Sequence, residues 1–260
     1  MIFTGSVVGL SIIGAIVYLA LPSSQRQLDL GGQADLPPFA EAAPVVASLA
    51  PATPSVADLA DGTWVLTASQ RTGIPARALK AYAGVAIKLH IINPTCGIGW
   101  NTLAGIGEIE SHHGTIFGGR VTANGTVVPP IFGVELDGVD VAKVPGAPSG
   151  AASGAASAAA SGAPTPNASP SFDRAAGPMQ LISQTWRNWH TDANADGVED
   201  VQNIDDATMA SANYLCRAGK HLGTESGWRT AILAYNRSER YRIDVLRSAV
   251  GYASDALTPR

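Results

Sequence analysis

A long tract of Ala, Ser, Gly and Pro limits what this chain can fold into. Residues 145–171 read PGAPSGAASGAASAAASGAPTPNASPS and contain no aromatic and no large aliphatic side chain. Such a composition cannot build a hydrophobic core, so the tract predicts a disordered insertion within one folded unit. Without it and the N-terminal segments described next, about 170 residues are available, which is enough for a single domain.

The N-terminal residues are apolar enough to enter a membrane. Residues 6–21, SVVGLSIIGAIVYLAL, carry no charge, and a run of this kind is typical of a membrane-directed helix. We interpret residues 1–22 as a signal-anchor, with a cleaved signal peptide as the alternative. Residues 23–62 are rich in Pro, Ala, Gln and Asp without periodicity, so they predict a disordered linker before a folded domain at 63–260. Both interpretations predict export of the chain.

Apolar residues recur at helical spacing through most of the remaining sequence, which predicts a mainly α fold. The helix beginning at Pro178 is expected to place Met179, Ile182 and Trp186 on one apolar stripe. Only the stretch 121–136 is typical of extended chain and turns. The predicted helices begin at Pro75, Thr102, Pro178, Asp205 or Asp206, Ser226 and Ser238.

The charge balance and the absence of several motifs argue against whole classes of protein. The chain has 17 Lys and Arg against 21 Asp and Glu, a net charge of -4, so it lacks the basic surface that nucleic-acid binding needs. The sequence holds no H-E-x-x-H, no G-x-S-x-G and no P-loop motif, so it offers no basis for a zinc peptidase, a serine esterase or a nucleotide-binding enzyme.

The two cysteines, Cys96 and Cys216, are too few for a cysteine-only zinc site. Neither has a neighbouring acid and base that would activate a thiol nucleophile. Because export brings the chain into an oxidising compartment, we expect the two residues to be joined in a disulfide.

One glutamate lies on the predicted apolar stripe of a helix. The stripe of the helix from Thr102 consists of Leu103, Ile106, Gly107 and Glu110. Glu108 points about 140° away from the stripe's centre. A carboxyl on an apolar stripe either pairs with a cation, here Arg120 or Arg174, or has its pKa raised by desolvation, as a general acid requires.

An acidic segment matches the first half of a calcium-binding loop. Calcium ligands in such loops are oxygen atoms at alternate positions, with a Gly at the sharp turn; here they would be Asp192, Asn194, Asp196 and the Val198 carbonyl, with Gly197 at the turn. Asp205 or Asp206 could close the site. The alternative is an acidic surface turn followed by helix-capping aspartates.

Three segments now stand in a recognisable order: GIGEIESHHG at 105–114, DRAAGPMQ at 173–180 and Ala234-Tyr235-Asn236. They are supported by GIPARAL at 73–79, CGIGW at 96–100 and ANYL at 212–215. Together they resemble the membrane-bound lytic murein transglycosylase B family, within the lysozyme-like superfamily. The resemblance runs from about Trp64 to Ala253 and is interrupted by the low-complexity insertion.

The resemblance implies a role for individual residues. Glu110 matches the family's catalytic acid and Ser111 follows it, as the family expects. Met179 and Gln180 would line a glycan cleft, while Tyr235 and Asn236 would contact sugar. The family's calcium loop ends at an Asp directly before Ala, which selects Asp206 over Asp205 as the last calcium ligand.

The resemblance also implies a reaction and a location. Glu110 would protonate the glycosidic oxygen between N-acetylmuramic acid and N-acetylglucosamine in peptidoglycan, and would then act as base while the muramoyl C6 hydroxyl attacks C1. The product would be a 1,6-anhydro end, and no second carboxylate is required. We expect a calcium-containing monomer in the bacterial cell envelope, membrane-anchored or secreted. The alternatives are a lysozyme-type muramidase and a peptidoglycan-binding module without activity.

Overall fold

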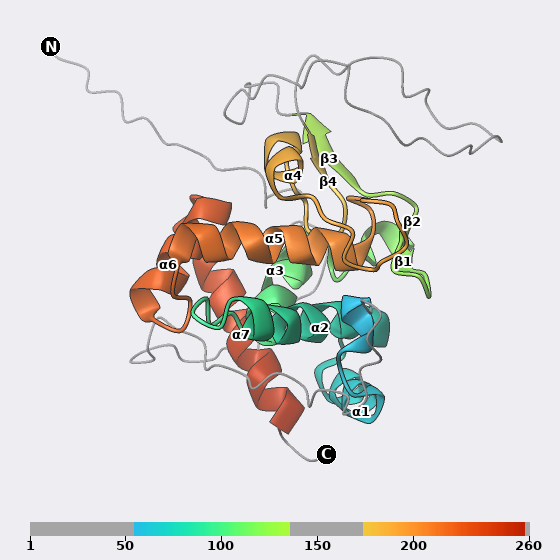
Figure 1. Ribbon diagram of the computed structural model, residues 1–260, viewed down its shortest axis with the longest axis horizontal. Helices are drawn as coiled ribbons and strands as arrows, with labels where there is room; N and C mark the ends of the chain where they lie inside the picture. The colour runs from blue at the N-terminus through green and yellow to red at the C-terminus, as the bar shows by residue number, and fades with distance from the viewer. Residues whose placement is uncertain (1–54, 136–173, 258–260) are drawn as a thin grey trace, which may run out of the picture.

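The computed structural model describes residues 55–135 and 174–257, and most of these residues are helical (Figure 1). Two 3-10 helices, η1 (Val56–Asp58) and η2 (Ile116–Gly118), and four short strands accompany the α-helices of this described part. The prediction of a mainly α fold is confirmed. The α-helices are α1 (Gly62–Thr72), α2 (Ala76–Ile92), α3 (Trp100–Ser111), α4 (Ser183–Trp189), α5 (Ile204–Gly219), α6 (Glu225–Tyr235) and α7 (Glu239–Leu257).

The expected signal-anchor, most of the expected linker and the low-complexity insertion lie outside the described residues. In the described part of the chain, no helix is both long and apolar enough to cross a membrane. The packed chain begins earlier than predicted. Val56 in η1 and the following Leu59 belong to the hydrophobic core and are 4% and 3% exposed, although both fall within the expected linker.

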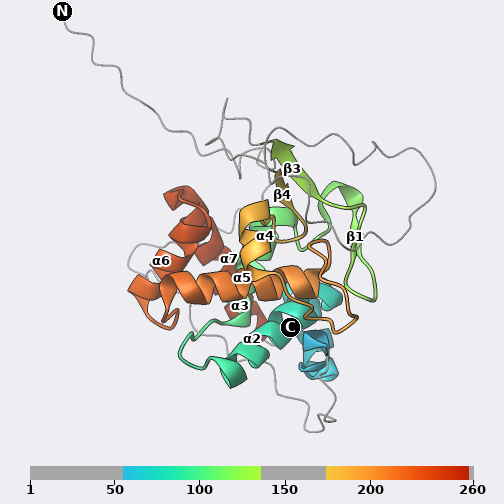
Figure 2. The same ribbon diagram turned by 45° about the horizontal axis from the view of Figure 1, so that its top comes forward.

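Helix α2 lies at the centre of the fold, with α1, α3, α5 and η1 packed against it. Helices α2 and α5 run side by side in Figure 1, and Figure 2 shows α4 and the strands on the other side of α5. The apolar residues that recur at helical spacing in α2 are buried. The opposite side of the helix is buried as well, because small residues let the neighbouring helices approach. The buried residues of α2 include Ala78, Leu79, Ala81, Tyr82, Ala83, Val85 and Ala86.

Two glycines allow α3 to lie tightly between α2 and α7. A Cβ atom at Gly105 would come within 2.9 Å of the Val245 carbonyl oxygen in α7. A Cβ atom at Gly107 would overlap the Tyr82 hydroxyl group in α2. Because real side-chain carbons do not approach other atoms this closely, glycine is needed at both positions. The close contact fixes the C-terminal turn of α3, where Glu110 lies.

The strands form two antiparallel pairs at one side of the helices (Figure 1). The first three strands lie at 120–135 and confirm the extended chain and turns predicted for this stretch. The predicted insertion lies between β3 (Phe132–Glu135) and β4 (Arg174–Ala176). These two strands pair so that Phe132 lies opposite Ala176 and Glu135 lies opposite Arg174. A long tract between two neighbouring strand ends adds little to the entropy of loop closure. The strands are β1 (Arg120–Val121), β2 (Val127–Val128), β3 (Phe132–Glu135) and β4 (Arg174–Ala176).

The prediction that a helix begins at Pro178 is wrong. Helix α4 begins only at Ser183. Pro178 lies in a turn between Gly177 and Gln180, whose φ angles are 74° and 47°, and a right-handed helix cannot contain such angles. Met179, expected on a helical stripe, is buried within this turn.

The other helix starts lie closer to the predicted residues. Thr102 does not cap α3, because the helix already begins at Trp100 and the Thr102 hydroxyl accepts a hydrogen bond from Trp228 Nε1 (3.1 Å). The cap of α5 is Asn203, which accepts a hydrogen bond from the Asp205 backbone N–H. Helices α6 and α7 begin one residue from the predicted Ser226 and Ser238.

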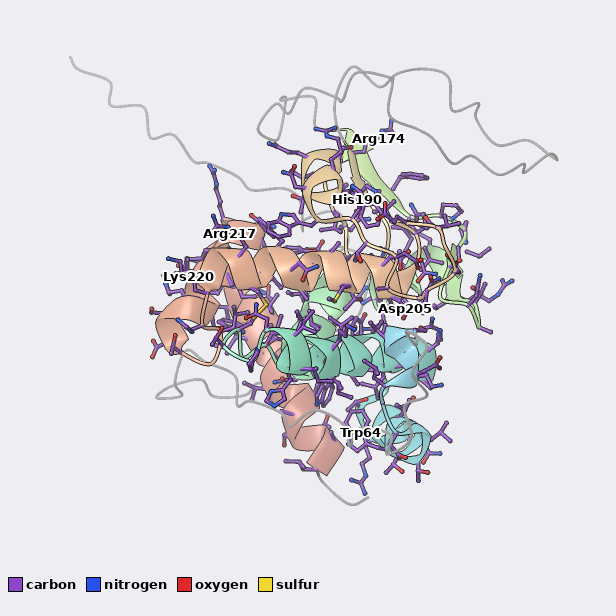
Figure 3. The ribbon with its side chains drawn as sticks, viewed as in Figure 1. Trp64, Arg174, His190, Asp205, Arg217 and Lys220 are labelled. Carbon is purple, nitrogen blue, oxygen red and sulfur yellow. A yellow bond between two sulfur atoms is a disulfide. The ribbon has the colours of Figure 1, made fainter. Side chains whose placement is uncertain are left out.

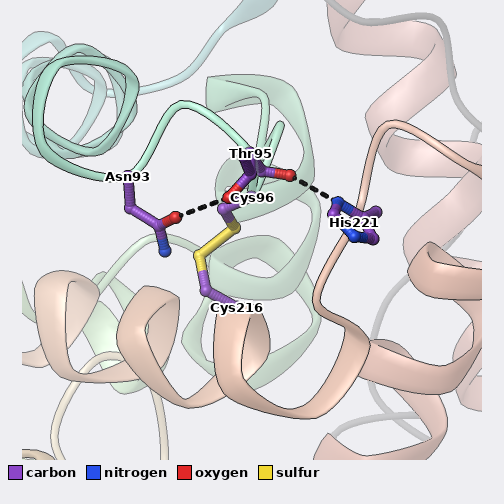
Figure 4. Close-up of a disulfide and its surroundings, with 5 residues drawn as sticks. All are labelled: Asn93, Thr95, Cys96, Cys216 and His221. Carbon is purple, nitrogen blue, oxygen red and sulfur yellow. Dashed lines mark hydrogen bonds between the residues drawn. A yellow bond between two sulfur atoms is a disulfide. The ribbon is translucent and has the colours of Figure 1, made fainter.

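The predicted disulfide between Cys96 and Cys216 is confirmed (Figure 4). It joins the loop between α2 and α3 to the last turns of α5, across a sequence separation of 120 residues. Hydrogen bonds reinforce the same junction: the Leu222 backbone N–H donates to the Cys96 carbonyl (2.6 Å), and His221 Nδ1 donates to the Thr95 carbonyl (3.0 Å). The disulfide therefore ties the loop after α2 to α5, two segments that lie far apart in the sequence.

We expect replacement of both cysteines by serine to lower the free energy of unfolding by at most about 4 kcal/mol. The value follows from the chain entropy that a cross-link removes from the unfolded state when it closes so long a loop. Denaturant unfolding of Cys96→Ser/Cys216→Ser measures it, and chemical reduction of the wild-type protein should give the same midpoint. Equal stability of the oxidised wild type and the double variant would contradict this expectation.

Candidate active site

Glu110 occupies a partly buried position at the end of α3. The Tyr241 hydroxyl donates a hydrogen bond of 2.6 Å to Glu110 Oε1 from α7. Burial raises the pKa of Glu110 to about 8, although the hydrogen bond from Tyr241 acts in the opposite direction. Within residues 55–135 and 174–257, neither Arg120 nor Arg174 forms an ion pair with Glu110. The carboxyl therefore has the protonation behaviour of a general acid at neutral pH.

Glu108, two residues earlier on α3, lies in the opposite electrostatic environment. Its carboxylate contacts His112 Nδ1 at 3.2 Å and His113 Nε2 at 3.1 Å. Burial alone would raise the pKa of Glu108, but the hydrogen bonds and charges of the two histidines outweigh burial and lower the pKa to about 2. The histidines therefore hold Glu108 in its ionised form, and the two glutamates of α3 lie in opposite electrostatic environments.

Ser111 connects α3 to the turn that contains Pro178. Its hydroxyl donates to the Pro178 carbonyl (2.6 Å) and accepts from the Gly114 backbone N–H (2.8 Å). The side chain is 1% exposed, so in this structure it positions the turn and has no open face for a sugar. The residue expected to contact substrate thus holds together two segments of the site.

The turn at 177–180 contributes one buried and one accessible residue. Met179 is fully buried, and its carbonyl accepts a hydrogen bond from the Tyr235 hydroxyl (2.6 Å). Gln180 is only half-buried, and its Nε2 donates to the Gly177 carbonyl (2.9 Å). Of these two predicted cleft residues, only Gln180 has a side chain that a ligand could reach without a rearrangement.

Four aromatic rings form a row that ends at Glu110. The Tyr241 ring is stacked on Tyr235, with ring centroids 6.5 Å apart and planes inclined by 8°. Tyr235 contacts Tyr214 at 6.1 Å, and Tyr214 contacts Trp189 at 6.5 Å. The row therefore crosses from α7 through α6 and α5 to α4. Aromatic faces are suitable surfaces for the apolar faces of sugars, and the hydroxyl groups of tyrosine add polar contacts.

Asn236 follows the row at the end of α6. Its side-chain oxygen accepts a hydrogen bond from the Ser238 backbone N–H (3.0 Å). Its side-chain nitrogen makes no hydrogen bond within the described part of the chain, and the residue is half-buried. Asn236 can therefore still donate a hydrogen bond to a ligand.

The predicted calcium residues fold into one turn through their own hydrogen bonds. Asp192 accepts from the backbone N–H groups of Asp196 and Gly197, at 3.1 and 2.9 Å. Asn194 Oδ1 accepts from the Asp196 N–H (3.0 Å), and Asp196 Oδ1 accepts from the Val198 N–H (2.8 Å). Among the described residues, no group of three or more His, Cys, Asp or Glu side chains is arranged to hold a metal ion.

The neighbouring aspartates Asp205 and Asp206 differ in their partners. Asp205, labelled in Figure 3, is fully buried and forms a bidentate ion pair with Arg77 at 2.8 and 2.5 Å. Asp206 is also fully buried but accepts only backbone hydrogen bonds, from Ala193, Asn194 and Asp200. Burial raises the pKa of Asp206 to about 6. A buried carboxylate of this kind, without a cation partner in the described part, is suited to receive a metal ion.

Sequence reasoning missed two groups that define the environment of α3. Helical spacing places Tyr241 on the inner side of its helix but does not indicate that its hydroxyl is hydrogen-bonded to Glu110. The adjacent His112 and His113 match no zinc-binding motif, and in the structure both contact Glu108. The only signal in the sequence for this contact was the hydroxyl group of Tyr241, because a buried tyrosine hydroxyl needs a hydrogen-bond partner.

Comparisons of this chain with protein families, with curated proteins and with solved structures found no match. The function is therefore inferred from the chemistry of the described residues.

We expect glutamine substitutions at the two glutamates of α3 to change stability in opposite directions. Because the pKa of Glu110 is raised from 4.5 to about 8, its contribution to stability is lost as pH rises through this range. Glu110→Gln should therefore melt at a higher temperature than wild type at about pH 9. Glu108 has a lowered pKa, so its contribution is present above 4.5 and is lost only as pH falls toward about 2. Glu108→Gln should therefore melt at a lower temperature at neutral pH.

Thermal unfolding at a series of pH values measures both effects, and each kcal/mol corresponds to about 2–4 °C for a domain of this size. A Glu110→Gln variant whose Tm follows the wild-type pH profile would contradict the raised pKa.

Proposed function

We propose that the chain is a peptidoglycan lytic transglycosylase with a lysozyme-like helical domain. The observation that carries this proposal is the raised pKa of Glu110, about 8, in a site where the group has a tyrosine partner and no ion pair in the described part of the chain. A carboxyl that remains protonated at neutral pH can give a proton to a glycosidic oxygen. The half-buried rings of Tyr235, Tyr214 and Trp189 offer a surface beside it for a glycan.

In the proposed reaction, Glu110 acts first as acid and then as base. It transfers its proton to the oxygen that joins N-acetylmuramic acid to N-acetylglucosamine, and the bond from C1 to this oxygen breaks. The carboxylate then accepts the proton of the muramoyl C6 hydroxyl as that oxygen bonds to C1. The proton count balances without water, and the product is a 1,6-anhydro ring. Tyr241 holds the carboxyl in place through its hydrogen bond.

The distribution of carboxylates favours this chemistry over two-carboxylate hydrolysis. A conventional glycosidase needs a second acid facing the first across the bond. Glu108, the other glutamate of this turn of α3, is already held by His112 and His113. Asp137 and Asp173, two acids on either side of the low-complexity insertion, lie outside the described residues. A muramidase that uses water remains the second candidate, because it needs the same protonated acid.

A peptidoglycan-binding module without activity is less consistent with the site. Such a module has no need for a carboxyl with a raised pKa, and it would favour a Glu110 that is exposed or ion-paired. Glu110 is neither. We also propose that the chain is exported to the bacterial cell envelope through residues 1–22, remains anchored or is secreted, and acts as a monomer on glycan strands.

We expect Glu110→Gln to reduce cleavage of purified peptidoglycan by roughly two to four orders of magnitude, because glutamine keeps the volume and removes the acid. Glu108→Gln is the matched control on the same helix and should retain activity close to wild type under conditions where it is folded. The wild-type rate should fall as pH rises through about 8, since the acid must be protonated.

Mass spectrometry of the products separates the two catalytic candidates. Ends of 1,6-anhydromuramic acid support the transglycosylase, whereas reducing muramic acid ends would assign a muramidase. An unchanged rate in Glu110→Gln, with normal folding, would overturn the catalytic role of this residue.

We further propose that the turn at 192–206 binds a structural calcium ion. Asp192, Asn194, Asp196, the Val198 carbonyl and Asp206 supply hard oxygen ligands, which calcium prefers. Asp206 is buried, and its carboxylate accepts backbone hydrogen bonds but has no cation partner in the described part of the chain. This supports the proposal, because a cation would offset the remaining cost of its charge. Bound calcium would fix the chain between α4 and α5.

We expect calcium added to chelator-treated protein to raise Tm, because an ion that binds only the folded state stabilises it by about 2.7 kcal/mol at a hundredfold excess over Kd. Magnesium serves as the ion control, since it demands a smaller octahedral site. Asp192→Asn should weaken the response while leaving the ion pair of Asp205 intact. A melting curve that does not move with calcium would identify the segment as an acidic surface turn.

A further inference from the structure

A basic cavity lies beside the disulfide, away from Glu110. Its volume is about 380 Å³, within the range of small-molecule sites. It is bordered by the last turns of α5, the end of α4 and the loop that follows α2. Figure 3 labels Arg217 and Lys220 on this part of α5, and Figure 4 shows His221 next to the disulfide. The lining residues that matter here are Trp189, Asn213, Arg217, Lys220 and His221.

The cavity presents hydrogen-bond donors and no acid. Arg217 and Lys220 are exposed, and neither forms an ion pair within the described part of the chain. His221 Nδ1 donates to the Thr95 carbonyl, which leaves Nε2 as its second ring nitrogen. No Asp or Glu of the described residues lines the cavity. Arg217 and Lys220 both line this hollow, and unpaired guanidinium and ammonium groups attract a carboxylate or a phosphate.

A purely structural reading explains only part of this arrangement. Cations near the C-terminus of a helix interact favourably with its dipole, which accounts for Arg217 and Lys220 on α5. It does not account for the loop residue His221, which lines the same hollow from outside α5. The Asn213 side chain makes no hydrogen bond in the described part of the chain, so it is available to a ligand.

The cavity is continuous with the aromatic row of the candidate site. Trp189 lines the cavity and is also the last ring of the row, 6.5 Å from Tyr214. The row leads through Tyr235 to Tyr241, which is bonded to Glu110. Tyr241 is buried, whereas the other three rings of the row are half-buried. A ligand that binds at Glu110 and extends over these three rings would reach the basic cavity at Trp189.

We propose that this cavity binds a carboxylate of the peptide stem carried by a peptidoglycan strand. The inference rests on the proposed function, because it assumes that a glycan occupies the aromatic row. Peptide stems are the anionic part of such a strand, and the cavity is the donor-rich hollow that adjoins the row. Arg217 would hold the carboxylate through its planar pair of N–H groups, and Lys220 would add a second charge.

Binding measurements with the full-length Glu110→Gln protein test the proposal without turnover. The probes are a glycan tetrasaccharide that carries tripeptide stems, the same tetrasaccharide with the stems removed, and the free stem tripeptide. We expect the stem-bearing glycan to bind about fivefold to tenfold more tightly than the stem-free glycan, as two exposed ion pairs would allow. Adding Arg217→Gln and Lys220→Gln should abolish this difference and leave stem-free binding unchanged.

Lys80→Gln is the matched control for loss of charge, because Lys80 is a lysine of α2 that lines a different cavity, together with Arg77. It should leave the preference for stems intact. An unchanged Tm in the Arg217→Gln/Lys220→Gln variant verifies that folding is preserved, as expected for exposed side chains.

The outcomes separate this inference from the proposed function. If stem-free and stem-bearing glycans bind equally and wild-type protein cleaves both, the cavity proposal is overturned and the proposed function stands. If the free tripeptide binds through Arg217 and Lys220 while no glycan is bound or cleaved, the cavity is an anion site and the proposed function fails. If no probe binds, the cavity proposal is overturned.

Discussion

The close contact of α3 with α2 and α7 is the constraint on which the candidate site depends. Gly105 and Gly107 remove the side chains that would hold these helices apart. The last turn of α3 then lies against two different surroundings. Glu110 faces Tyr241 of α7, whereas Glu108 faces a pair of histidines. Two glutamates only two residues apart thus acquire pKa values of about 8 and about 2.

The turn beside α3 depends on side chains that act as connectors. Ser111 binds the Pro178 carbonyl, and Tyr235 binds the Met179 carbonyl. These bonds attach the turn to α3 on one side and α6 on the other. Ser111 and Met179, which were expected to contact sugar, therefore hold the turn in place. A ligand would meet Gln180 and the faces of the aromatic rings, because Ser111 and Met179 are buried.

Local sequence patterns predicted the structural features that follow from helical periodicity. They did not predict the features that tertiary contacts determine. The buried side of α2 and the inner position of Glu110 follow from spacing, since a helix repeats every 3.6 residues. The turn at Pro178 could not be predicted in this way. It is imposed by positive φ angles at Gly177 and Gln180 and by pairing of the chain on either side of it. The bond between Tyr241 and Glu110 joins residues 131 positions apart, which no local pattern reports.

Among the buried aspartates and the glutamates of α3, the residues without a cation partner are the same ones that the sequence motifs single out. Of the three buried aspartates in the described chain, Asp205 is paired with Arg77, and Asp244 is paired with Arg240 and Arg247. Only Asp206 has no cation. Among the α3 glutamates, Glu108 has histidine partners and Glu110 has none. Leaving a carboxyl without a cation costs stability, and a fold tolerates that cost where the carboxyl must hold a proton or a metal ion. In the proposed function, Glu110 would meet the first need and Asp206 the second.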